Sequence, residues 1–359
     1  MTSLMHEMGA RALALGIPLS VHLDLTYRCN ERCVHCYLDH EDRGEMTTAE
    51  IVRVLDELAD SGVFFLTLSG GEVFMRRDFF EILEHARAKL FAVKVKTNAV
   101  MVTRAKAERV AGLGVESVQV SLYSHRADVH DRITKLPGSF GRTIEGARLL
   151  RECGVKVSFA NVLMKDNADD YREVRALALA MGVEYKVDPT ITPMMDGGRG
   201  VLALNIDEAR LAAVYADEEL TRGAAVSRAA PGGPMPREEA LDSVPCSAGH
   251  TLAYISPYGE VFPCVQFPYA CGNVREKPFA EIWRNSPQLR EVRSISLADV
   301  EGCSTCVHGG SCSRCPGLAY TEGNLRGPSI QDCERTYAIT GVPSENLKRR
   351  KGVIWLVSV

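Results

Sequence analysis

Cysteine placement is the feature that most constrains this chain of 359 residues. Eleven of its twelve cysteines form two groups, one near each end of the sequence: Cys29, Cys33 and Cys36, and then Cys246, Cys264, Cys271, Cys303, Cys306, Cys312, Cys315 and Cys333. The exception, Cys153, ends the amphipathic stretch ARLLRECG and is expected to be a core residue. In a chain without an export signal, cysteines at short, regular spacings indicate metal binding rather than disulfides. The sequence therefore predicts metal sites at both ends of a scaffold nearly free of cysteine.

Charge and hydropathy exclude several classes of partner. The net charge is −4, without the clustered basic excess that nucleic-acid-binding proteins show. The opening residues MTSLMHEMGARALALGIPLS lack the basic, apolar and small-residue order of a signal peptide. No apolar run reaches the roughly 18 residues that a membrane span requires. We therefore expect a cytoplasmic protein with no nucleic-acid and no membrane partner.

Short apolar runs alternate with amphipathic stretches from residue 19 onwards. Strands are predicted at 19–25, 64–69, 93–97, 117–121, 156–161 and 184–187, and helices at about 47–60, 78–90, 103–112, 140–153 and 168–181. Thr47 with Glu50 three residues later is typical of a capping box at a helix start. Repeated strand–helix units favour a parallel sheet with right-handed crossovers. The fold class predicted is α/β, a partial (β/α)6 TIM-like barrel with its chemistry at the carboxyl ends of the strands.

The predicted domain organisation follows from where this repetition stops. We expect an N-terminal extension over 1–16, the partial barrel over 17–200, a helix and flexible linker over 201–242, a small cysteine-rich domain over 243–335 and a C-terminal tail over 336–359. The linker is rich in Gly, Pro and small residues. The cysteine-rich domain would bury little apolar area, so it needs metal to hold it together.

The first cysteine group directly follows the first strand, in TYRCNERCVHCYLDH. Cys29, Cys33 and Cys36 have the spacing C-x3-C-x2-C, and three thiolates can ligate three irons of a [4Fe–4S] cube. The fourth iron then lacks a protein ligand, and an open coordination position is typical of a catalytic metal centre. The alternatives are buried thiols or a zinc site completed by His35 or His40.

Polar residues and glycines follow the later strands. Gly70, Gly71 and Glu72 end the second strand, where glycines let the backbone approach a ligand and a carboxylate can accept hydrogen bonds from an ammonium group. Further candidates are Asn98, Ser121 and Asn161 at the next strand ends and Arg132 in HDRITK. The alternative for each of these four is that it caps its own loop.

These motifs together resemble the radical S-adenosylmethionine (SAM) superfamily, whose pattern is C-x3-C-x-aromatic-C; His35 takes the aromatic position. The resemblance implies that SAM binds the open iron, and that one electron then breaks a C–S bond and releases a 5′-deoxyadenosyl radical. It implies that the Gly-Gly-Glu segment with Glu72 holds the SAM amine, and that Asn98, Ser121, Asn161 and Arg132 contact its ribose and carboxylate. It also implies an external one-electron reductant of the flavodoxin or ferredoxin type.

The second cysteine group reads C-x12-G-x4-C, then C-x2-C-x5-C-x2-C, then a final cysteine. Because no histidine stands at zinc-finger spacing, this pattern suggests two four-thiolate centres. A zinc ribbon over 303–315 is the alternative, but it leaves the remaining cysteines unexplained.

The pattern resembles the SPASM extension of radical SAM enzymes, which carries two auxiliary iron–sulfur clusters. By motif position, the outer cluster is held by Cys303, Cys306, Cys312 and Cys333, and the inner one by Cys246, Cys264 and Cys315. The chain departs from the pattern by one residue, because two residues rather than three separate Cys312 from Cys315. For the fourth inner position, Cys271, an open iron and a free thiol all stay possible.

The resemblance also predicts the substrate class. SPASM enzymes mostly modify peptides, so we expect a peptide-modifying maturase. The predicted barrel begins near residue 17, so a separate protein could supply recognition of a leader peptide. One alternative is a radical SAM enzyme acting on a small molecule such as a tetrapyrrole. Another is an iron–sulfur or zinc module without catalysis, although such a module has no use for an open iron beside Glu72.

Overall fold

The computed structural model describes residues 4–221, 244, 246–309 and 312–351, which form two compact units. The first unit contains residues 4–205 and 248–289, and the second contains the described parts of 206–247 and 290–351. From residue 222 on, the linker expected over 201–242 lies outside the described residues, and the sequence-based domain limits stay a prediction. Among the described helices, none has the length and apolar character needed to cross a bilayer.

One nine-stranded sheet forms the centre of the first unit, in the order β6-β5-β4-β3-β2-β1-β7-β8-β9. Strands β1 to β6 pair in parallel, β7 pairs in parallel with β1, and β8 and β9 continue antiparallel. The bounds are β1 (Ser20–Asp24), β2 (Phe65–Ser69), β3 (Ala92–Thr97), β4 (Ser117–Ser121), β5 (Val157–Val162), β6 (Glu184–Asp188), β7 (Leu252–Ile255), β8 (Glu260–Phe262) and β9 (Gly272–Asn273). All the strands predicted up to residue 187 are present, and the partial barrel is confirmed.

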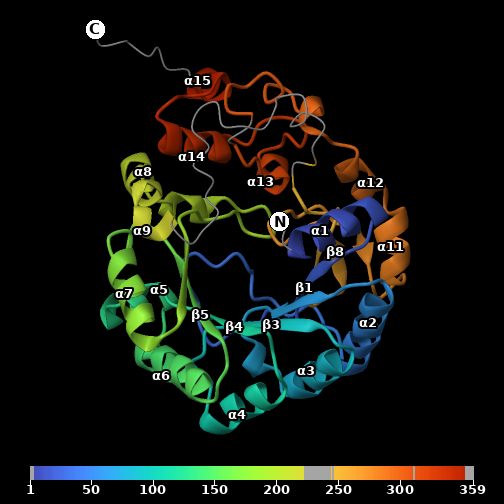
Figure 1. Ribbon diagram of the computed structural model, residues 1–359, viewed down its shortest axis with the longest axis vertical. Helices are drawn as coiled ribbons and strands as arrows, with labels where there is room; N and C mark the ends of the chain where they lie inside the picture. The colour runs from blue at the N-terminus through green and yellow to red at the C-terminus, as the bar shows by residue number, and fades with distance from the viewer. Residues whose placement is uncertain (1–3, 222–243, 245, 310–311, 352–359) are drawn as a thin grey trace. The chain divides into compact units, whose positions relative to one another are not determined.

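The helices predicted between the strands lie along the outer side of this sheet (Figure 1). They are α2 (Thr48–Asp60), α3 (Phe79–Ala88), α4 (Arg104–Gly112), α6 (Ser139–Glu152) and α7 (Tyr171–Met181). The unit also contains α1 (Leu4–Leu15), η1 (Val73–Met75), α5 (Ala127–Thr134), η2 (Gly200–Leu204) and α11 (Phe279–Asn285). The capping box of α2 forms as predicted: Glu50 N–H donates to the Thr47 hydroxyl at 3.3 Å, and Thr47 N–H donates to the Glu50 carboxylate at 2.7 Å.

Alternation of side chains along the strands decides which side is polar. In β3, Val93 and Val95 are fully buried in the core beneath the helices. Lys94 and Lys96 occupy the alternate positions, so they point to the other face of the sheet. The inner side of the barrel is therefore lined in part by polar side chains, below the strand ends where the chemistry of such folds is located.

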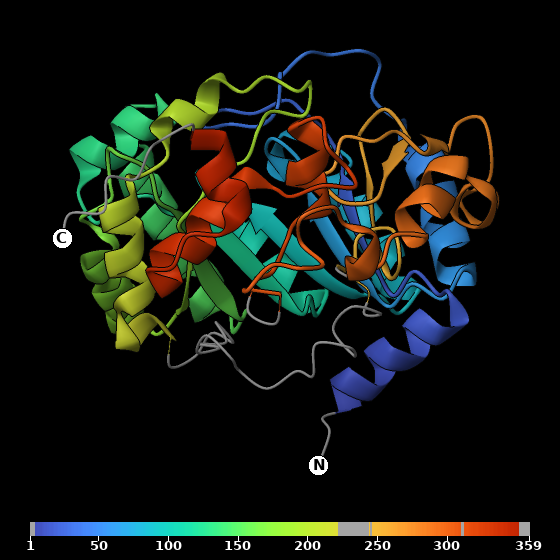
Figure 2. The same ribbon diagram turned by 90° about the horizontal axis from the view of Figure 1, so that it is seen from above.

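Residues 248–289 belong to the same unit as the barrel strands. Helix α11 lies beside α2 in both views (Figure 1 and Figure 2). The Arg53 guanidinium of α2 donates to the Val274 carbonyl at 2.8 Å, and Phe279 N–H donates to the Glu57 carboxylate at 2.7 Å. This part of the chain extends the barrel sheet through β7, and hydrogen bonds attach it to α2.

The second unit is mainly helical in its described part. Its elements are α8 (Glu208–Ala216), α9 (Glu218–Thr221), η3 (Leu297–Asp299), α13 (Pro316–Thr321), α14 (Ile330–Thr340) and α15 (Glu345–Lys351), while α12 (Pro287–Arg293) spans the border between the units. Helices α8 and α14 contact each other. The buried apolar side chains include Leu211, Val214, Val300, Leu318 and Leu347. This set is small, which agrees with the expectation that metal binding stabilises this region.

Candidate functional site

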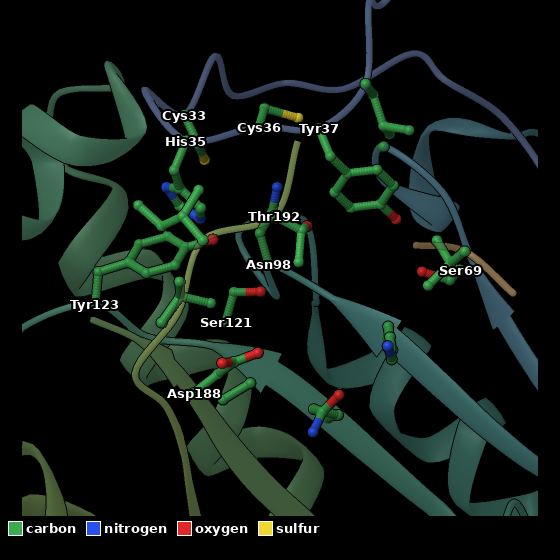
Figure 3. A pocket seen from close by; sticks show the side chains of 18 of the residues that line it. Cys33, His35, Cys36, Tyr37, Ser69, Asn98, Ser121, Tyr123, Asp188 and Thr192 are labelled. Atoms are coloured by element: carbon green, nitrogen blue, oxygen red, sulfur yellow. The ribbon is translucent and has the colours of Figure 1, made fainter. Parts of the chain in front are cut away.

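The first cysteine group lies on the loop between β1 and α2. Val34 N–H donates to the Ile133 carbonyl at 3.0 Å and so fastens this loop to the end of α5. Cys29, Cys33 and Cys36 all line the same cavity. Figure 3 shows Cys33 and Cys36 on one stretch of chain at the edge of this cavity.

Burial controls the protonation of these thiols. It raises the pKa of Cys29 to about 12, and it also raises the pKa values of Cys33 and Cys36. The thiols are therefore protonated at neutral pH without metal, and iron binding must displace their protons. Within the described residues, no group of three or more His, Cys, Asp or Glu side chains is arranged to hold a single metal ion. A [4Fe–4S] cube has a different requirement, because each thiolate binds its own iron.

The cavity below the cysteine loop has a volume of about 350 Å³, within the range of small-molecule sites. It brings the three cysteines together with five further residues predicted from sequence: Gly70, Gly71, Asn98, Ser121 and Asn161. Figure 3 shows Asn98 and Ser121 below the stretch of chain that carries Cys33 and Cys36. Three thiols at one edge and polar strand ends at another form a donor set that fits an iron–sulfur cluster carrying a small polar ligand.

The two glycines stand where the chain passes in contact with the cysteine loop. Gly71 N–H donates to the Thr26 carbonyl at 2.7 Å. A Cβ atom on Gly71 would lie 2.4 Å from the Arg28 carbonyl oxygen, and one on Gly70, whose φ is +135°, would lie 2.2 Å from the Thr26 carbonyl oxygen. Both are backbone atoms, so the clash cannot be relieved by a side-chain rotation. Glycine is therefore required to dock this turn against the segment that leads into Cys29.

Replacing Gly71 by alanine is expected to lower the rate of SAM cleavage tenfold or more, because the turn must move away from the cysteine loop and a 1 Å displacement can cost about 100-fold. The measurement is 5′-deoxyadenosine formation by the reconstituted variant. Gly112→Ala is the matched control, since a Cβ atom there meets nothing within 4 Å. A Gly71→Ala enzyme as fast as the Gly112→Ala enzyme would contradict this role of the turn.

Glu72 is fully buried and does not line the cavity. Its carboxylate accepts hydrogen bonds from Phe74 N–H at 3.0 Å, from Asn98 N–H at 2.8 Å and from the Thr97 hydroxyl at 2.8 Å. Burial raises the pKa of Glu72, while these hydrogen bonds oppose the rise. The side chain thus joins the glycine turn to the end of β3 and positions Asn98. Direct contact between Glu72 and the SAM amine stays a prediction.

The remaining candidates from the sequence differ in their partners and in whether they line the cavity. Asn98 Nδ2 donates to Asn30 Oδ1 at 2.8 Å, which orients this amide beside the cysteine loop. Asn161 Nδ2 donates to the Leu122 carbonyl at 2.8 Å, so this amide also holds the end of β4 in place. Arg132 does not line the cavity. Its side chain on α5 is 56% exposed and pairs with Asp128 at 3.8 Å.

Sequence reasoning missed a set of polar residues inside the barrel. The cavity is also lined by His22, Tyr37, Lys96, Gln119, Lys186 and Asp188. The signal was present in the strands themselves: charged and amide side chains at alternate positions of a parallel strand are unusual unless one face lines a site. Such inward positions are not strand ends, so a prediction based on strand ends does not include them.

The predicted outer cluster ligands come together within the second unit. Burial raises the pKa of Cys303 to about 12 and that of Cys333, on α14, to about 11. Cys333, Cys312 and Cys306 raise the pKa of Cys303 further, and Cys312 and Cys306 also raise the pKa of Cys333. The chain from Cys303 to Cys306 forms a tight turn, in which Cys306 N–H donates to the Cys303 carbonyl at 3.0 Å. Four thiols in mutual electrostatic contact suit a four-thiolate cluster.

The predicted inner ligands are divided between the two units. Cys246 and Cys315 belong to the second unit, and Cys264 and Cys271 belong to the first. Cys271 is buried, and its thiol donates to the Tyr269 carbonyl at 3.1 Å. Val265 and Gln266, which directly follow Cys264, line the cavity under the first cysteine group. The grouping of these cysteines around one cluster stays a prediction.

Comparison with known proteins identifies the family. Residues 23–178 match the radical SAM superfamily, and residues 246–307 match the SPASM iron–sulfur cluster-binding domain. The mycofactocin maturase MftC of Mycobacterium tuberculosis is 31% identical over 83% of this chain and 78% of its own length. This chain belongs to the radical SAM superfamily. Its cofactors are therefore SAM and a [4Fe–4S] cluster, and its iron–sulfur domain carries auxiliary clusters.

Two further proteins broaden the comparison for this radical SAM protein. The AdoMet-dependent heme synthase of Methanosarcina barkeri is 28% identical over 84% of this chain and 92% of its own length. The crystal structure of Streptococcus suis SuiB bound to the precursor peptide SuiA has a TM-score of 0.72 at 18% identity, covering 92% of this chain and 80% of SuiB. The likeness to SuiB is one of fold.

Proposed function

We propose that this radical SAM enzyme modifies a side chain of a peptide or protein, as a maturase of ribosomally made peptides. The observation that carries the proposal is a single cavity that joins the three cysteines to a polar barrel interior. The sequence relationship to MftC, a mycofactocin maturase, supports the substrate class. The likeness of fold to SuiB agrees with it.

The roles of the chain's own residues follow from the geometry. When bound, the cluster and SAM supply a 5′-deoxyadenosyl radical that abstracts hydrogen from the substrate. Cys29, Cys33 and Cys36 hold the cluster, and the glycine turn closes the wall beside them. Asn98 lines the cavity with an amide that Asn30 orients. Ser121 adds a hydroxyl at the next strand end.

The partners and the compartment are further parts of the proposal. An external flavodoxin or ferredoxin would supply the electron, and a separate protein would recognise the leader peptide. A cytoplasmic location is supported by the cysteines, none of which forms a disulfide although twelve are present.

The second candidate function is modification of a tetrapyrrole or a similar small molecule. It is favoured by the relationship to the heme synthase of Methanosarcina barkeri, which spans 92% of that protein. Both candidates share SAM cleavage and differ only in what enters the cavity.

The test is anaerobic reconstitution of the full chain with iron, sulfide, dithionite and SAM. We expect 5′-deoxyadenosine, and a mass change in a short precursor peptide encoded beside the gene. A mass change in an added porphyrin precursor, with none in the peptide, would establish the second candidate instead. Absence of 5′-deoxyadenosine from a preparation with about twelve irons per chain, four for each of three cubes, would overturn both.

A further inference from the structure

Lys96 and Gln119 form a pair of polar side chains in the cavity wall. They are register partners on the neighbouring parallel strands β3 and β4, so their side chains point to the same face of the sheet. Both line the cavity, and both are half-buried. In the part of the chain that the structure describes, neither side chain has a hydrogen-bond or ion-pair partner.

The nearby carboxylates are already engaged by other groups. Asp24 accepts a hydrogen bond from the Tyr254 hydroxyl at 2.9 Å and lies 3.0 Å from His22 Nε2. Asp188 Oδ1 accepts from Thr190 N–H and from the Thr190 hydroxyl, both at 3.1 Å. These two carboxylates favour the charged form of Lys96, but burial outweighs them and lowers its pKa.

Lys186, which also lines the cavity, differs from Lys96 because a carboxylate lies near its ammonium group. Lys186 on β6 lies 3.9 Å from the Glu184 carboxylate, which also pairs with Lys156 at 3.1 Å. Lys96 therefore stands out as an ammonium group partly removed from water without an ion partner of its own. Such a group is stabilised when an anion binds beside it.

We propose that Lys96 and Gln119 bind a carboxylate group of the peptide substrate. The ammonium supplies the charge and the amide NH2 supplies a second donor, and neighbouring strands about 4.8 Å apart place the two donors within reach of one carboxylate. The inference rests on the proposed function and names the substrate group that this site would recognise.

Lys96 and Gln119 lie deeper in the barrel than the residues at the strand ends. Ser121 ends β4 two residues after Gln119, and Asn98 directly follows β3, two residues after Lys96. Two residues correspond to about 6.6 Å along a strand. A carboxylate held by Lys96 and Gln119 would leave the remainder of the substrate residue pointing toward the cysteine loop.

The experiment is a calorimetric titration of the reconstituted full-length enzyme, anaerobically and with saturating SAM. The probes are three N-acetylated pentapeptides of otherwise identical sequence: one with a free C-terminal carboxylate, one with a C-terminal amide, and one amide with an internal glutamate. We expect at least one carboxylate peptide to bind about tenfold more tightly than the neutral amide, as a charge-assisted hydrogen bond predicts. Which of the two gains affinity identifies the source of the carboxylate.

Lys96→Met is expected to abolish this advantage, while Lys94→Met should retain it. Lys94 lies on the same face of β3, but it does not line the cavity. The proposal fails if wild type shows no preference for a carboxylate, or if Lys96→Met keeps the preference. A loss of SAM affinity in Lys96→Met with the preference intact would assign the lysine to SAM. Failure of the proposed function is seen separately, as absence of 5′-deoxyadenosine from wild type.

Discussion

Changing Cys29, Cys33 and Cys36 together to alanine is expected to lower 5′-deoxyadenosine formation on the order of a thousandfold or more. The reason is that the cofactor carries the radical chemistry, and these thiols are the cavity's only cysteines in the described structure. Iron content should fall from about twelve to about eight atoms per chain, since one cube is lost. Anaerobic product analysis and iron determination on the same preparation provide the measurement.

Cys153→Ala is the matched control for this triple variant. Cys153 follows α6, and its sulfur accepts a hydrogen bond from the Arg104 guanidinium at 3.6 Å, away from the cavity lining. We expect this variant to keep both its iron and its activity. SAM cleavage that persists in the triple variant would show that the first cysteine group does not hold the cluster that reacts with SAM.

The barrel could be predicted because its signals are local. The strands are short and carry apolar residues at least at alternate positions, and helix starts such as Thr47 with Glu50 carry their own capping residues. The cavity could be found from Cys29, Cys33 and Cys36 and from Gly71, because parallel strands bring their carboxyl ends to one edge of the sheet.

What could not be predicted depends on the direction in which a side chain points. The Glu72 carboxylate accepts hydrogen bonds from Thr97 and Asn98 at the end of β3, an arrangement that the sequence does not reveal, and its contact with the SAM amine stays a prediction. Arg132 was expected near SAM, but α5 places it at the surface beside Asp128. Lys96 was overlooked because its importance depends on which residues lie across the barrel. The pairing of β7 with β1 joins segments more than 200 residues apart, so no local pattern encodes it.

Replacing Cys303 and Cys306 by alanine is expected to remove the outer cluster and with it the order of the second unit. The described apolar core of this unit is small, so the free energy of cluster binding is a large share of its folding free energy. Burial lowers the pKa of Arg314, while negative charge on Cys303 favours its charged guanidinium. Without Cys303 this buried cation loses one of the negative groups that favour its charge, although Asp332 remains. We expect rapid proteolytic cleavage within 290–351 and a loss of about four irons per chain.

Val307→Ala is the control for this double variant, because Val307 lies in the same turn region but its side chain is 75% exposed. It should resist proteolysis as wild type does. In the Cys303/Cys306 variant the barrel unit has its own sheet and core, so 5′-deoxyadenosine should still form while the modified peptide is lost. If the double variant instead kept its protease resistance and all of its iron, these cysteines would not be cluster ligands, and the stability of the second unit would have to come from its apolar contacts alone.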